Sequence, residues 1–216
     1  MKMVTHSLRR KSAAGFTLIE LLTVVVIIVL MLSGAAVLFK DNGRGVSVSY
    51  SVPTLAGTFA MARNQAMASG TNVRLVVDSV YDVTHPDNYL RRFALMQPVG
   101  SGTAATWERK TTPTFLPKGV YYSPIYSVPT DRMTTKFDLT SPVGSQYYYE
   151  FDETGQLSAS SSGSSSARMV VTTGFIQNGA LVVPASAVNN RDGVLIHHLG
   201  RVSYFQKPDE ITAVTP

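Results

Sequence analysis

The chain has 216 residues, no cysteine and a formal net charge of +5. The absence of cysteine excludes disulfide bonds and thiolate metal sites. Four of the 19 basic residues stand within residues 1–15, and the remaining 15 nearly balance the 14 acidic residues. The basic charge therefore belongs to the N-terminus, and nucleic acid is not an expected partner of the rest of the chain.

An apolar run follows the basic N-terminal stretch. Residues 21–39 carry no charge, and a helix of that length, at about 1.5 Å per residue, nearly crosses the ~30 Å hydrocarbon core of a bilayer. The stretch before it holds the basic residues Lys2, Arg9, Arg10 and Lys11. The positive-inside rule therefore predicts a single-pass inner-membrane protein with its N-terminus in the cytoplasm and the remainder exported. Glu20 is the fifth residue of the apolar segment that begins at Phe16, and because a carboxylate at membrane depth costs about 2.5 to 3.5 kcal/mol, we expect it to have a partner.

The segment Gly15-Phe16-Thr17-Leu18-Ile19-Glu20, after a short basic leader, resembles the processing site of type IV pilins and type II secretion pseudopilins. The resemblance implies that prepilin peptidase cuts after Gly15 and methylates the new N-terminal residue, Phe16. It also assigns Phe16 and Glu20 to assembly, because the ammonium of a neighbouring subunit can compensate the buried carboxylate of Glu20 as apolar helices stack.

Two other interpretations of this segment stay open. An ordinary signal peptide would be cut near residues 34–36, where small residues stand, although a charge inside its apolar core fits poorly. A plain single-span membrane anchor would tolerate the sequence, but it gives no reason for Gly15, Phe16 and Glu20 to occur in this order.

After the apolar run the composition changes. Residues 40–45 are polar and rich in glycine, and residues 46–52 alternate between valine or tyrosine and serine, so we expect an interrupted helix or an extended linker near residues 41–52. A second, amphipathic helix is predicted over residues 54–69, ending at Gly70. One face of that helix carries the apolar residues Leu55, Phe59, Ala62 and Ala66. Residues 62–75, from the end of this helix into the next predicted strand, resemble the segment that minor H-type pseudopilins and related pilin-like proteins place between the stem helix and the first strand.

From residue 71 onward the patterns are those of strands. Strands are predicted at 73–77, 92–97, around 107, at 115–122, 147–151, 168–172, 194–198 and 201–205. Residues 152–155 form a predicted turn, and the serine-rich residues 158–166 form a predicted loop. The fold class is therefore α+β: an apolar N-terminal helix, an amphipathic helix and an antiparallel β-rich, pilin-like head of two small sheets. The predicted divisions are a leader at 1–15, a membrane helix at 16–39, the break and second helix at 40–70 and the head at 71–216.

No motif predicts catalysis, and we expect no enzyme, cofactor or metal site. His197 and His198 are neighbours, and one is predicted buried and the other exposed, because adjacent strand residues point to opposite faces. Asp152 and Glu153 are assigned to their turn rather than to acid–base chemistry. The loop acids Asp82 and Asp87 near His85 lack the spacing of a calcium loop. The tyrosine-rich stretches 121–122 and 147–149 are assigned to core packing rather than to a nucleic acid surface.

The resemblance implies a structural subunit of a pseudopilus, namely a minor H-type pseudopilin of a type II secretion system with its head in the periplasm. The implied partners are prepilin peptidase, other pseudopilins or pilins, membrane lipid, and an inner-membrane assembly platform with its ATPase. A minor pilin of a type IV pilus, used for adhesion or DNA uptake, is the nearest alternative. A membrane-anchored periplasmic binding protein is a third.

Overall fold

The structure is a computed structural model that describes residues 17–100, 106–139, 141–159, 166–205 and 207–213, without the side chains of residues 31–46. The chain divides into two compact units, residues 1–42 and 43–216. In the first unit the described residues belong almost entirely to helix α1, Leu18–Ser69, which continues into the second unit. Of the residues that the structure describes, none form a helix with the length and apolarity that crossing a membrane requires.

The expected break near residues 41–52 is wrong, since α1 runs through them without interruption. Val48 and Val52 are buried and lie one helical turn apart, on the face that continues to Leu55 and Phe59. Ser51 donates its hydroxyl hydrogen to the carbonyl oxygen of Ser47, at 2.8 Å, as residues four apart in a helix do. The period-two pattern of valine and serine is thus overridden by burial of one helical face. The helix predicted over residues 54–69 is present as the C-terminal part of α1.

The described residues of the head form three antiparallel sheets, where two were expected. The largest has the strand order β3-β2-β1-β7-β6, with β4 also pairing with β2. Its strands are β1 Val73–Val77, β2 Arg92–Val99, β3 Thr106–Arg109, β4 Thr114–Phe115, β6 Asp131–Lys136 and β7 Val143–Phe151. The predicted strands at 73–77 and 92–97 are both present, and they pair antiparallel with Leu75 opposite Leu95.

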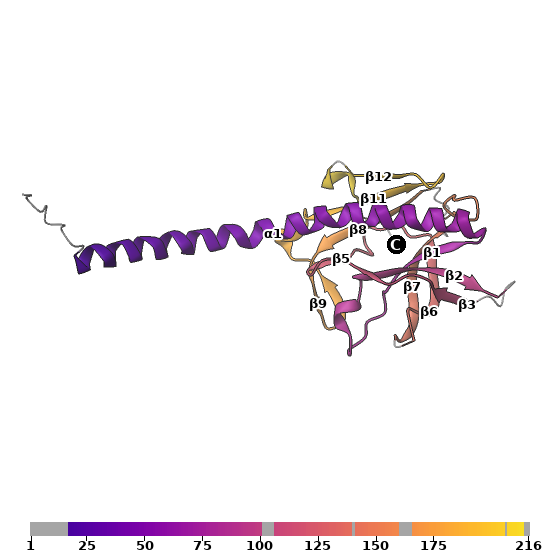
Figure 1. Ribbon diagram of the computed structural model, residues 1–216, viewed down its shortest axis with the longest axis horizontal. Helices are drawn as coiled ribbons and strands as arrows, with labels where there is room; N and C mark the ends of the chain where they lie inside the picture. Colours follow the sequence, from indigo (N-terminus) through magenta and orange to yellow (C-terminus); the bar gives the residue numbers. More distant parts are fainter. Residues whose placement is uncertain (1–16, 101–105, 140, 160–165, 206, 214–216) are drawn as a thin grey trace, which may run out of the picture. The chain divides into compact units, whose positions relative to one another are not determined.

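The second sheet has the order β12-β11-β8-β5, and the third is a hairpin of β9 and β10. Their strands are β5 Val120–Tyr122, β8 Ser166–Thr173, β9 Phe175–Gln177, β10 Ala180–Val182, β11 Arg191–His197 and β12 Val202–Tyr204. Short 3₁₀ turns connect strands at η1 Pro86–Asn88 and η3 Ala185–Ala187 and follow the last strand at η4 Pro208–Glu210. Figure 1 shows β11 and β12 on one side of α1, and β2, β3 and β6 on the other side.

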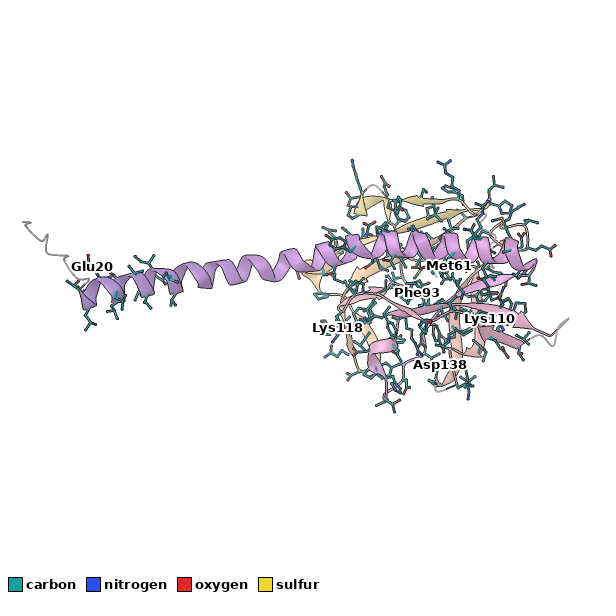
Figure 2. The ribbon with its side chains drawn as sticks, in the orientation of Figure 1. Glu20, Met61, Phe93, Lys110, Lys118 and Asp138 are labelled. Carbon is teal, nitrogen blue, oxygen red and sulfur yellow. The ribbon has the colours of Figure 1, made fainter. Side chains whose placement is uncertain are left out.

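One hydrophobic core joins α1 to both larger sheets. Phe59 of α1 packs edge-on against Tyr149 of β7, with ring centroids 5.2 Å apart, and against Phe151 at 6.3 Å. Phe93 is fully buried in the same core, and Figure 2 shows it in the interior of the head below α1. The predicted cap is also confirmed: Gly70 has a φ of 61°, and its N–H donates to the carbonyl oxygen of Ala66.

Candidate processing and assembly site

The N-terminus of α1 is closed by a reciprocal pair of side chains. Glu20 Oε2 accepts hydrogen bonds from the backbone N–H of Thr17, at 3.1 Å, and from its hydroxyl, at 3.0 Å. In return, the N–H of Glu20 donates to Thr17 Oγ1, at 3.3 Å. The first helical bond then runs from the N–H of Leu21 to the carbonyl oxygen of Thr17. Thr17 is therefore the N-cap residue, and Glu20, three residues later, completes a capping box.

This arrangement gives Glu20 a role within its own subunit. The first turn of a helix leaves backbone N–H groups without partners, and its dipole favours negative charge there. The carboxylate of Glu20 satisfies one of these groups, although the side chain is exposed. This contact was not among the expectations from the sequence, yet Thr17-Leu18-Ile19-Glu20 ahead of an apolar run is the usual signature of a capping box.

The remaining processing residues, Gly15 and Phe16, lie outside the described residues, so their assignment stays a prediction. The side chains of Leu18 to Leu30 in α1 are exposed in this single chain wherever they are large and apolar. A helix that is apolar on every side needs lipid or other apolar helices around it.

The two histidines do not form a metal site. His197, at the end of β11, and His198, in the following turn, are both exposed, so the expectation that one is buried is wrong. Because β11 ends at His197 and a turn begins at His198, the two side chains do not follow the alternation of buried and exposed positions that a strand would give. His197 Nε2 lies 2.9 Å from the hydroxyl of Ser203, and His198 Nδ1 lies 3.2 Å from the carbonyl oxygen of Leu157. Within the described residues, no group of three or more histidine, aspartate or glutamate side chains is placed to hold a metal ion.

Asp152 is a turn residue, as predicted. Its Oδ1 accepts hydrogen bonds from the N–H and hydroxyl of Thr154 and from the N–H of Gln156. Partial burial alone would raise the pKa of Asp152, but these hydrogen bonds outweigh that effect and hold the pKa below its ordinary value. Asp82 has a similar local role, accepting from the N–H and hydroxyl of Thr84.

The tyrosines are mainly core residues. Tyr122 and Tyr149 are fully buried and Tyr148 is 8% exposed, while Tyr121 and Tyr147 pack against the core from its edge. Burial raises the pKa of Tyr149, whose hydroxyl donates to the carbonyl oxygen of Arg168 at 2.8 Å. These rings therefore belong to the packing of the core, as predicted.

The chain is similar to known proteins in its N-terminal segment and in its fold. Residues 10–36 match the prokaryotic N-terminal methylation motif. No curated protein matches the chain. Among solved structures, the minor pseudopilin EpsH from the type 2 secretion system of Vibrio cholerae is similar, with 10% sequence identity and a TM-score of 0.39. That alignment covers 74% of this chain and 96% of EpsH.

Proposed function

We propose that this protein is a structural subunit of a pseudopilus, processed after Gly15 and anchored by the apolar part of α1. The observation that carries the proposal is the match of residues 10–36 to the N-terminal methylation motif. That segment contains Gly15, Phe16 and Glu20 in the order that prepilin processing requires, followed by an apolar helix.

Three residues have individual roles in this proposal. Gly15 is the last residue of the leader, and its lack of a side chain suits the peptidase cut. Phe16 becomes the methylated N-terminus. The carboxylate of Glu20 bonds the N–H of Thr17, the second residue of the mature chain. A carboxylate held at that position can meet the ammonium of a neighbouring subunit when helices assemble side by side.

Within this class we propose a minor H-type pseudopilin of a type II secretion system. The leader, residues 1–15, stays in the cytoplasm, residues 16–39 cross the inner membrane, and the head stands in the periplasm. The partners are prepilin peptidase, other pseudopilins, membrane lipid and the assembly platform with its ATPase. The proposed role is structural. The sequence of the head contains no nucleophile elbow, phosphate-binding loop or zinc-protease motif that would indicate catalysis.

A strain that lacks this protein tests the function. We expect exported enzymes to accumulate in the periplasm of the deletion strain, and wild-type protein to restore their release. The uncut variant Gly15→Ala should fail to restore it, whereas Ser12→Ala, a leader substitution away from the cut, should succeed. Normal release with loss of surface pili would instead support a type IV pilus. Normal release and normal pili in the deletion strain would contradict both.

A further inference from the structure

An uncharged groove lies at one end of the head. It has a volume of about 310 Å³ and is formed by the loops around η1, the turn after β5, and the β9–β10 hairpin with the segment after it. Its lining residues are Tyr89, Leu90, Ser123, Pro124, Ile125, Tyr126, Gly179, Ala180, Leu181, Val183 and Val188. A lining without charge, with tyrosines among aliphatic side chains, suits a boundary between an apolar phase and water.

Apolar side chains at the rim of the groove are open to solvent. Ile125 is 61% exposed and Val188 is 43% exposed. Exposed apolar side chains beside an uncharged groove suit contact with a partner or a membrane.

The groove lies at the end of the head where α1 enters. Val48 and Ser49, near the start of α1 in the second unit, share a small depression with Asn189 and Asn190. Those two residues directly follow Val188 of the groove. The start of β5 lies beside the end of β8, which leads into the β9–β10 hairpin of the groove: Val120 pairs with Thr173, and the N–H of Gly174 donates to the carbonyl oxygen of Gly119. Lys118 also lies at this end, and Figure 2 shows it on the opposite side of the head from Lys110.

The chain leading to this end is short. Nine residue steps separate Phe39, the last residue of the uncharged run, from Val48 in the core of the head. Even a fully extended chain of that length reaches only about 30 Å. When the apolar segment that ends at Phe39 lies in the bilayer, the membrane surface is therefore within about 30 Å of Val48. Lipid is then within reach of the exposed apolar residues at the groove.

We propose that this end of the head rests in the interfacial layer of the membrane when the subunit is anchored, with Ile125 and Val188 in contact with lipid. The inference rests on the proposed function, since it requires α1 in the bilayer. Tyrosines at a groove rim are suited to the headgroup level, where one end of the ring is apolar and the other is hydrated. The contact would hold the head against the bilayer until assembly extracts the subunit.

Lipid quenching of single labels tests the proposal, and the natural lack of cysteine makes each label unique. The full-length chain is placed in liposomes whose lipids carry a nitroxide at the headgroup, with a fluorophore at Ile125→Cys, Val188→Cys or Leu199→Cys. Leu199 is the matched control, because it is 66% exposed but lies in the turn after β11, next to the strand end where His197 pairs with Ser166, and does not line the groove. We expect quenching at Ile125 and Val188 to exceed that at Leu199 at least threefold. Ile125→Asp should reduce the quenching at Val188→Cys.

A label at Ile27→Cys, with nitroxides on the acyl chains, separates the two proposals. If Ile27 is quenched but Ile125, Val188 and Leu199 give equal signals, the anchor stands and the lipid contact is overturned. If Ile27 is not quenched, the chain is not anchored and both proposals fail. If the groove labels are shielded from aqueous iodide without lipid quenching, a protein covers the groove and the lipid contact is again overturned.

Discussion

Arg63 of α1 donates a hydrogen bond from Nε to the carbonyl oxygen of Gly155, at 3.1 Å, and so ties the helix to the turn that ends β7. Gly200, in the turn between β11 and β12, lies against the same two groups. Two turns that are 45 residues apart in the sequence therefore meet on a single side chain of the helix. This contact holds the two larger sheets at the C-terminal end of α1.

Gly200→Ala is expected to destabilise the head by at least about 2 kcal/mol. Gly200 has a φ of 75°, and an added Cβ would collide with the carbonyl oxygen of Gly155 and come within 2.7 Å of Arg63 Cδ. Gly70→Ala is the matched control, since Gly70 has a φ of 61° but no neighbouring atom within 4 Å of the added Cβ. Urea unfolding followed by the fluorescence of Trp107, the single tryptophan, measures both. Equal losses would show that backbone strain alone, and not the contact with Arg63, makes Gly200 necessary.

Phe59→Ala should cost about 3 to 5 kcal/mol of unfolding free energy, as removal of a buried aromatic ring does. Phe59 is fully buried and joins α1 to Tyr149 and Phe151 of β7. Phe175→Ala, which removes the same ring from a half-exposed position, should cost less than about 1 kcal/mol. A small loss at Phe59 in the same unfolding assay would mean that α1 is not part of the cooperative core.

Arg74 is enclosed by two aromatic rings and an acid. Its guanidinium carbon lies 3.8 Å from the ring centre of Trp107 and 4.0 Å from that of Tyr148, and Nε bonds Glu150. Arg74→Lys should therefore destabilise the head by about 1 to 2 kcal/mol, because an ammonium cannot stack between two rings in this way. Arg132→Lys, where the guanidinium covers only Tyr147 on an exposed strand, should cost about 0.5 kcal/mol or less. Similar losses at the two positions would rule out the stacking as the cause.

The unfolding free energy of the head at acidic pH should depend on the ionisation of Asp152. Because its folded pKa lies below its ordinary value, ionised Asp152 stabilises the head above the unfolded pKa of about 3.9. That contribution is lost as the pH falls through the folded pKa. The difference in unfolding free energy between wild type and Asp152→Asn should thus shrink as the pH is lowered below about 4. Thr154→Val, which removes one hydrogen bond to the carboxylate, should move this change to higher pH. A difference that is constant with pH would contradict the assignment.

Much of the head was predictable from local patterns. The strand at Val73–Val77 and its pairing with the strand beginning at Arg92 follow from runs of apolar and branched residues. The face of α1 that carries Leu55, Phe59, Ala62 and Ala66 follows from helical spacing, and all four are fully buried.

Other elements depended on tertiary context or on signals that were overlooked. β6, Asp131–Lys136, is a charged edge strand without a clear apolar alternation, so only its pairing with β7 makes it a strand. The β9–β10 hairpin carried the Asn178-Gly179 signal of a tight turn, and both residues have positive φ angles. At Glu20, the resemblance predicted a role between subunits, whereas the capping box with Thr17 is a contact within one subunit and comes from local spacing.

The most direct test of the account is the intact mass and N-terminal sequence of the protein after coexpression with prepilin peptidase. We predict a mature chain that begins at N-methylated Phe16, and an uncut Gly15→Ala variant. Glu20→Gln should be cut normally but should not support filament assembly. A mature chain that begins near Val37 would show that the apolar segment is an ordinary signal peptide, and it would contradict both the anchor and the subunit role proposed for this protein.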